Sequence, residues 1–229
     1  MGLLGERTAK PLPILSRLIK RLTNVVYCRS IISQFLANPK LGTTAMMQFD
    51  EIKATQAAAL VLQLRGGQMH YIKLIKLLYL ADREALLRWG ITITTDRHVS
   101  MDNGPVTSRI LSLITEDRPK PIWSQYVSPP LGEYEVKLLK EAPRDRLSRA
   151  ETNLIYEIFT QYGHRNRWDL VDNVMHKLPE WKNPQGSSIP ISLRDILEAS
   201  GENEDEIRAV IREIQSVADD EDRLARVYA

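Results

Sequence analysis

Residues 71–89 constrain the fold more than any other part of the sequence, because apolar side chains recur there at three- and four-residue steps. This spacing predicts an α-helix, and Gly90 is placed to end it. Apolar residues extend around most of the helix, so we expect it to lie at the centre of a domain, covered on two sides. The apolar set comprises Tyr71, Ile72, Leu74, Ile75, Leu77, Leu78, Leu80, Ala81, Ala85, Leu86, Leu87 and Trp89.

Shorter helical patterns lie on both sides of this stretch. Ser148 followed by Glu151 is a capping-box signature, and Ser192 with Asp195 marks a second helix start. Gly163 is placed where a left-handed residue ends a helix. Helices are predicted over residues 50–64, 105–114, 148–162, 168–178, 192–200 and 207–217, followed by an acidic tail at 219–222.

Residues 91–138 lack helical periodicity over most of their length. The sequence Asn103-Gly104-Pro105 supplies turn chemistry, and Pro105 suits the first turn of a short helix. Residues 134–138 alternate between apolar and polar side chains, which predicts a half-buried strand with residues 122–127 as its partner. The predicted fold is therefore mainly α: a compact helical domain around the central helix, with a small antiparallel β-hairpin.

Charge is divided unevenly along the 229 residues. Residues 1–46 hold seven basic side chains against Glu6 alone, a net charge of +6, whereas the remainder holds 24 basic and 28 acidic side chains, a net charge of −4. Apolar residues between positions 15 and 26 share a helical face opposite Arg17, Lys20 and Arg21, which predicts a basic amphipathic helix. We therefore expect a basic N-terminal arm (1–46) and a helical domain (47–229).

Three interpretations of the arm remain open. A basic amphipathic helix can lie on a membrane surface, and it can bind a partner molecule. In the third interpretation, translation begins at Met46 or Met47 and the arm is not part of the protein.

The sequence contains no pattern typical of an active site. Its single cysteine, Cys28, excludes a disulfide framework and favours a reducing, cytoplasmic compartment. The four histidines lack metal-ligand spacing, and no nucleophile elbow, phosphate loop or dinucleotide motif occurs. Since no run of 18 apolar residues is present, no membrane span is predicted. We expect no enzymatic activity, no cofactor and no metal.

Two predicted helices separated by Gly66-Gly67 invite a helix-turn-helix interpretation. A recognition helix needs an exposed face of basic and polar side chains, however, and residues 71–89 are apolar around most of the helix. The net charge of −4 also opposes the binding of duplex DNA. Nucleic-acid binding is therefore not expected of the domain.

Three motifs, taken in order, resemble one family. They read Lys76-Leu77-Leu78-Tyr79-Leu80-Ala81-Asp82-Arg83-Glu84-Ala85-Leu86, then Thr95-Asp96-Arg97-His98-Val99-Ser100-Met101 through Asn103-Gly104-Pro105-Val106, and finally His176-Lys177-Leu178-Pro179-Glu180-Trp181. Their order and spacing are similar to those of the Panacea domain, the SocA-like antitoxin family of bacteria and phages. The resemblance covers roughly residues 50–215. The family often has a basic or histidine residue before the Gly-Pro pair, where this chain has Asn103.

The resemblance implies a mainly helical antitoxin that neutralises a cognate protein toxin, encoded by an adjacent gene, through direct binding. Two alternatives remain open: an adaptor that presents a client protein to a protease, and a DNA-binding autoregulator that uses the basic arm.

The motifs supply the candidate partner-binding residues. These are Asp82, Arg83, Asp96, Arg97, Asn103, Gly104, Pro105, Val106, His176, Pro179, Glu180 and Trp181. Each also has a structural interpretation. Asp82 and Arg83 can anchor the loop at Asp96 and Arg97, and His176 and Trp181 can pack within the helical domain.

Overall fold

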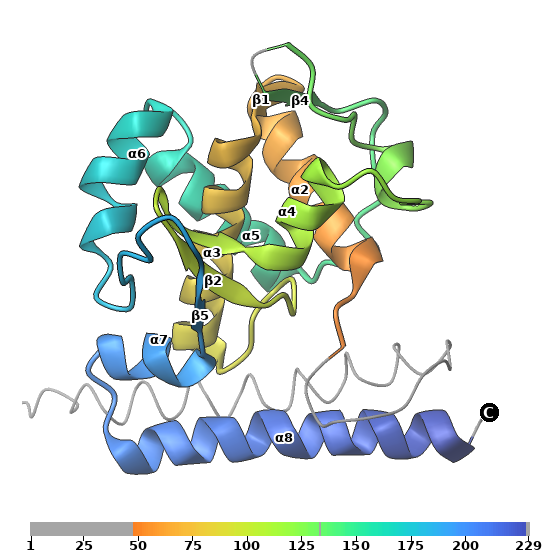
Figure 1. Cartoon of the computed structure of the whole chain (residues 1–229). Helices are drawn as coiled ribbons and strands as arrows, with labels where there is room; N and C mark the ends of the chain where they lie inside the picture. The colour runs from red at the N-terminus through yellow and green to blue at the C-terminus, as the bar shows by residue number, and fades with distance from the viewer. Residues whose placement is uncertain (1–47, 133, 228–229) are drawn as a thin grey trace, which may run out of the picture. The chain divides into compact units, whose positions relative to one another are not determined.

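The computed structural model describes residues 48–132 and 134–227. Contacts divide the chain into two units, Thr44–Asp220 and a second unit made of Met1–Thr43 with Glu221–Ala229. The first unit holds all described strands and helices except the last turns of one helix (Figure 1). The basic arm lies outside the described residues, so its amphipathic helix and its boundary at residue 46 stay predictions.

Helices dominate the described part of the chain, and the predicted mainly α fold class is confirmed. The α-helices are α2 (Glu51–Leu64), α3 (Tyr71–Trp89), α4 (Ser108–Thr115), α5 (Arg149–Tyr162), α6 (Arg167–Asn173), α7 (Leu193–Ala199) and α8 (Glu204–Val227). Two short 3-10 helices, η1 (Trp123–Gln125) and η2 (Met175–Lys177), lie between them. Among these described helices, none combines the length and apolarity needed to cross a membrane.

The strands form two small antiparallel sheets. They are β1 (Gln68–His70), β2 (His98–Met101), β3 (Gly104–Thr107), β4 (Glu135–Lys137) and β5 (Ile189–Ile191). β1 pairs with β4, and β2 lies between β3 and β5. Because Asp102 and Asn103 alone separate β2 from β3, these two strands form a tight hairpin.

α3 is the central element of the unit (Figure 1). It contacts α2, α4, α5, α6, α7, β1 and β3, and twelve of its nineteen residues are buried. At its start the ring of His70 accepts a hydrogen bond from the amide of Ile72, 3.2 Å away. At its end Gly90 adopts a left-handed conformation, with φ of 77°, and its amide donates to Leu86. The predicted central helix is confirmed at both ends.

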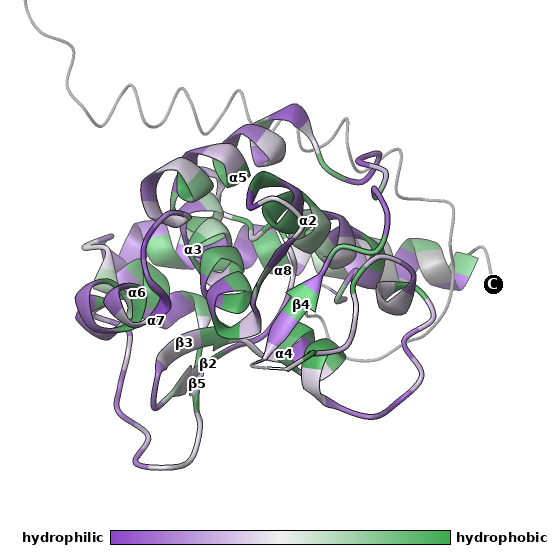
Figure 2. Cartoon of the chain, turned by 90° about the horizontal axis from the view of Figure 1, so that it is seen from above, coloured by the Kyte–Doolittle hydropathy of each residue, from purple (hydrophilic) through white to green (hydrophobic). Residues whose placement is uncertain are grey.

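α2 packs beside α3 through a face of small residues. Ala54, Ala57 and Ala58 are fully buried, which lets the helix backbone approach its neighbours closely. Figure 2 shows α2 coloured mostly as hydrophobic. Lys53 on this helix forms a 2.6 Å ion pair with Glu151 of α5. Glu151 also completes the capping box with Ser148, as predicted.

A second, smaller hydrophobic cluster joins α7 and the first half of α8 to the end of α3. Its buried members are Leu86, Ile191, Ile196, Leu197, Ile207 and Val210. The capping box of Ser192 and Asp195 starts α7, as predicted. The first turn of α8 is acidic, which favours the positive end of the helix dipole.

The hairpin predicted at residues 122–127 and 134–138 is wrong in its pairing. Residues 123–125 form η1, and only Val127 makes an isolated bridge, to Leu138. β4 does form, but its partner is β1, which follows the Gly66-Gly67 break in the sequence. β1 has only three residues, which is too short for the alternation of polar and apolar side chains to distinguish a strand from a loop.

Four further expectations are corrected by the backbone. Pro105 lies in β3 and not in a helix, because α4 begins only at Ser108. Gly163 has a φ of −64°, so it is not the left-handed residue that was predicted. The helix predicted at 168–178 is interrupted at Val174 into α6 and η2, and the acidic residues 219–222 continue α8.

Two lysines of α3 point into the protein interior. Lys73 donates hydrogen bonds to the carbonyl oxygens of Gly163 and Arg165 at 2.5 and 2.7 Å, which satisfies the end of α5. Lys76 has no exposed surface, and the hydrogen bond from its Nζ to the Pro105 carbonyl is 3.4 Å long. Burial lowers the pKa of Lys76 to about 7. Burial and the neighbouring charge of Arg65 lower the pKa of Lys73 to about 8.

We predict that Lys76→Met stabilises the protein at neutral pH and that this gain shrinks as the pH rises. The unfolded chain holds the Lys76 proton up to a pKa of 10.5, whereas the folded chain releases it at about 7. The cost of burying the charge is therefore complete below pH 7 and falls by about 1.4 kcal/mol per pH unit above it. Denaturant unfolding across this range measures the difference in the free energy of unfolding.

Lys182→Met, at an exposed position, is the matched control and is expected to follow the wild type at each pH. A constant difference between Lys76→Met and the wild type from pH 7 to pH 10.5 would contradict the assigned cost.

Candidate functional site

The fold brings the three sequence motifs together around α3 and the β2–β3 hairpin. α3 supplies Asp82 and Arg83, and the loop before β2 supplies Asp96. The segment from η2 onward supplies His176, Glu180 and Trp181. The motifs are far apart in the sequence, but hydrogen bonds connect them directly.

Asp82 fixes the loop that leads from α3 to β2. Its buried carboxylate accepts a 2.8 Å hydrogen bond from the amide of Thr94 and another from the Thr94 hydroxyl. It also accepts one from Nε2 of His98, at 3.2 Å. The His98 ring in turn lies edge-on to the ring of Tyr79, with centroids 5.2 Å apart. Asp82 therefore ties the start of the hairpin to the middle of α3.

Asp96 caps α4 from outside that helix. Thr107 at the N-cap position makes no side-chain capping bond, and Asp96 accepts from the amides of Arg109 and Ile110, each at 2.9 Å. Its carboxylate also accepts a 2.6 Å hydrogen bond from the amide of Arg97. Burial raises the pKa of Asp96, although these three amides act in the opposite direction. The residue supplies the acceptor that the first turn of α4 lacks.

Glu180 is the centre of the second polar network. Its side chain is fully buried and accepts from Nε of Arg83 at 2.7 Å and from the hydroxyl of Tyr79 at 2.9 Å. A longer contact of 3.4 Å joins the second guanidinium nitrogen to the other carboxylate oxygen. Burial and the adjacent Glu180 raise the pKa of Tyr79 far above its usual range, so the phenol keeps its proton. Arg83 therefore pairs with Glu180 and anchors the third motif to α3.

His176 and Trp181 clamp the turn of the hairpin. Their rings are stacked, with centroids 4.2 Å apart. His176 donates from Nε2 to the carbonyl of Asp102 at 2.9 Å, and Trp181 donates from Nε1 to the carbonyl of Met101 at 3.0 Å. Two side-chain donors thus satisfy two carbonyl groups at the end of β2.

Gly104 is required where the hairpin meets η2. Its φ is +96°, and a Cβ atom there would lie 2.5 Å from Cβ of Met175 and 3.4 Å from Nζ of Lys76. Only glycine combines this backbone conformation with so close an approach. The Gly104-Pro105 pair therefore serves as a packing surface between α3 and η2, where the sequence suggested a turn and a helix start.

The other candidate residues divide by exposure. Val106 is buried in the main core, whereas Arg97, Asn103 and Pro179 are exposed. Five residues that contact the candidates were not themselves predicted as candidates: Lys76, Tyr79, Thr94, His98 and Met175. Lys76, Tyr79 and His98 lie within the quoted motifs, and a polar side chain within such a motif is the signal that could have identified them. Whether any of the selected residues contacts a partner stays a prediction.

The acidic side chains of the motifs form hydrogen bonds within the domain. The carboxylates of Asp82, Asp96 and Glu180 each accept two or more hydrogen bonds from the protein itself. Within residues 48–132 and 134–227, no three His, Cys, Asp or Glu side chains gather in a way that would hold a metal ion. The motif residues thus position the hairpin, α4 and η2 against α3.

We predict that Gly104→Ala lowers the free energy of unfolding by about 3 kcal/mol or more, because backbone strain and overpacking act together. Gly186→Ala is the matched control: its φ is +84°, but nothing lies within 4 Å of the added Cβ. The control is expected to lose only the backbone contribution, about 1–2 kcal/mol. Denaturant unfolding measures both, and equal losses would show that the contact with Met175 is unimportant.

Comparison with known proteins identifies the arrangement. Residues 74–182 match the family model described as antitoxin SocA-like, Panacea domain, whereas no curated protein and no solved structure matches the chain. The matched range begins in α3 and ends just after Trp181, so it contains both polar networks and the hairpin between them. Residues 74–182 of this chain are thus similar to the Panacea domain of the SocA-like antitoxin family.

Proposed function

We propose that the chain is a cytoplasmic antitoxin that neutralises a toxic protein, encoded by an adjacent gene, by binding to it directly. The observation that carries this proposal is the match of residues 74–182 to the SocA-like antitoxin model. In this proposal the domain acts as a binding surface and does not turn over a substrate.

The internal use of the motif side chains supports a binding role. Asp82, Asp96 and Glu180 are buried and bonded to groups of the same chain, so their charges hold the fold together. A protein that acts by covering its partner needs a rigid body with a specific surface, and these networks supply the rigidity. An interface burying about 1,600 Å² is enough for a stable complex.

Co-expression with the adjacent gene tests the proposal. We predict that the toxic protein alone stops growth and that the full chain restores it. Affinity purification of the full chain is expected to recover the toxic protein as a stable complex. Failure of both rescue and co-purification would contradict the proposal.

The abundance of the toxic protein separates neutralisation from adaptor activity. Direct neutralisation leaves the toxic protein present at an undiminished level, as measured by immunoblotting, because it is held in a complex. Rescue accompanied by a fall in its level, reversed when a protease gene is deleted, would favour an adaptor instead.

A further inference from the structure

One face of the first unit carries a group of exposed and half-buried apolar and cationic side chains that the family motifs do not include. We define this aromatic face by six residues from β1, β4, α6 and the loop before β4: His70, Leu131, Tyr134, Lys137, Arg167 and Trp168. In Figure 1 β1 and β4 lie at the upper end of the unit, with α6 beside α3.

A cavity of about 440 Å³ opens within this face. It is lined by four members of the face together with Gly132 and Glu135. Its size is within the range of sites that receive a ligand or a side chain. The cavity therefore offers a place for an anchoring group of a partner.

Large apolar side chains around the cavity are unusually exposed. Tyr134 is 61% exposed, and Leu131 and Trp168 are each 48% exposed. The ring of Tyr134 also contacts the rings of His70 and Tyr71, with centroid distances of 5.9 and 6.0 Å. Exposed tyrosine and tryptophan close to arginine are typical of the residues that dominate binding energy at protein interfaces.

Tyr134 is held in a conformation that costs free energy. Its φ is +67°, in the left-handed region that aromatic residues rarely occupy. Its carbonyl accepts a 3.0 Å hydrogen bond from the amide of Tyr71, which fixes this backbone at the start of α3. The protein thus maintains a strained backbone while presenting the aromatic ring to solvent, as is common at binding sites.

The charges on this face indicate an acidic partner. Among the described residues that line the cavity, Lys137 and Arg167 are cationic and Glu135 is anionic. Nε of Arg167 is buried and has no hydrogen-bond acceptor in the described part of the chain, while its guanidinium lies 5.4 Å from the Trp168 ring. A carboxylate brought into the cavity would give this guanidinium an acceptor.

A protein fits the face better than a nucleic acid. Proteins that hold single-stranded nucleic acid use a cationic groove that follows many phosphates. Here the two cations lie beside one cavity, which offers room for a single anionic group and not for a run of phosphates. Leu131 adds an aliphatic contact that suits an apolar side chain.

We propose that the aromatic face is the docking site for the partner protein, which contributes an acidic segment with an apolar side chain. The carboxylate pairs with Arg167 and Lys137, and the apolar side chain enters the cavity beside Leu131. This inference rests on the proposed function for the identity of the partner, the adjacent toxic protein.

Charge reversal on the full chain tests the proposal by biolayer interferometry against the purified product of the adjacent gene. Arg167→Glu is expected to weaken binding by about 100-fold or more, because attraction becomes repulsion. Lys137→Glu is also expected to weaken binding, and because Lys137 is exposed the substitution is expected to leave folding unchanged. Affinity of the wild type is expected to fall as salt is added.

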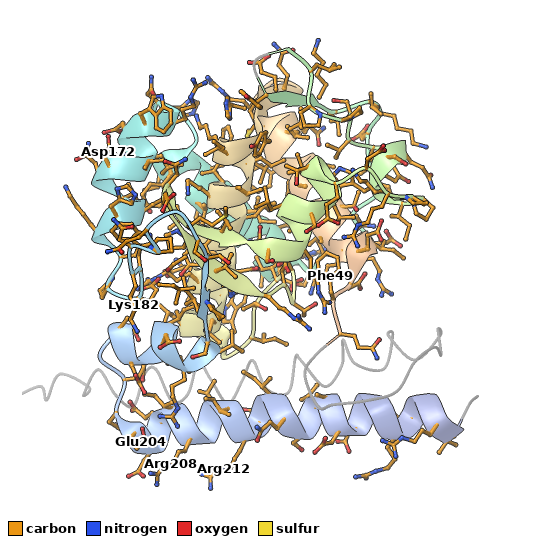
Figure 3. All side chains as sticks on the ribbon, viewed as in Figure 1. Phe49, Asp172, Lys182, Glu204, Arg208 and Arg212 are labelled. Atoms are coloured by element: carbon orange, nitrogen blue, oxygen red, sulfur yellow. The ribbon has the colours of Figure 1, made fainter. Side chains whose placement is uncertain are left out.

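Two further variants separate binding from structure. Tyr134→Asn removes the ring but tolerates the left-handed backbone, so binding is expected to fall by about 10-fold while the thermal midpoint is unchanged. Arg212→Glu is the control. Figure 3 shows Arg212 on the side of α8 that faces away from α7, and the residue is exposed. The affinity of the Arg212→Glu variant for the product of the adjacent gene is expected to stay within about 2-fold of the wild-type affinity.

The outcomes distinguish the two proposals. If the wild type binds the toxic protein and the three face variants bind equally well, the docking site is wrong and the proposed function stands. If the wild type does not bind, the proposed function fails.

The full chain is then titrated with a synthetic peptide of glutamate and leucine. Binding of the peptide to the wild type that is lost in Arg167→Glu supports an acidic ligand, and no binding to the wild type overturns the inference. Binding of a labelled single-stranded RNA that is lost in Arg167→Glu also overturns it.

Discussion

The burial of α3 on almost all sides is the constraint on which the rest of the structure depends. A polar side chain on the buried faces of this helix cannot reach water, so it needs a partner inside the protein. Asp82 accepts hydrogen bonds from Thr94 and His98. Arg83 forms an ion pair with Glu180, and Lys73 donates to a carbonyl group at the end of α5. These partners come from segments up to 97 residues away in the sequence, so the same bonds that satisfy α3 also fix the tertiary structure.

This constraint separates motif residues that bond within the chain from residues that stay exposed. Glu180 is 4% exposed, although its motif also includes the exposed Pro179. Tyr134, at 61%, lies outside every motif. The buried networks form the framework of the unit, whereas the aromatic face lies at its surface.

Local sequence signals predicted the helices well because their physical causes are local. The periodicity of residues 71–89 and the capping boxes at Ser148 and Ser192 each act within a few residues, and each appears in the structure. The strand pairing was harder to predict, since the paired residues of β1 and β4 are 65 to 69 positions apart and each strand has only three residues. Pro105 was predicted to start a helix, but it lies opposite Ser100 in the β2–β3 hairpin. The neighbouring Gly104 packs against Met175, a contact between distant segments that no local pattern reveals.

The sequence predicted which residues belong to the candidate site better than it predicted what each residue contacts. The motifs identified Asp82, Arg83 and Glu180, but the pairing of Arg83 with Glu180 depends on the chain returning to α3. The aromatic face was not predicted at all. Its residues come from four separate segments with no common spacing, and their exposure is visible only in the folded chain.

Hydrogen–deuterium exchange of the full chain, alone and in complex with the product of the adjacent gene, distinguishes the aromatic face from the motif networks as the interface. If the aromatic face binds the partner, exchange slows in residues 68–73, 134–138 and 165–172, and residues 94–107 and 175–182 are unchanged. Protection confined to residues 98–107 and 175–182 would contradict the proposed docking site, because the motif networks themselves would then form the interface.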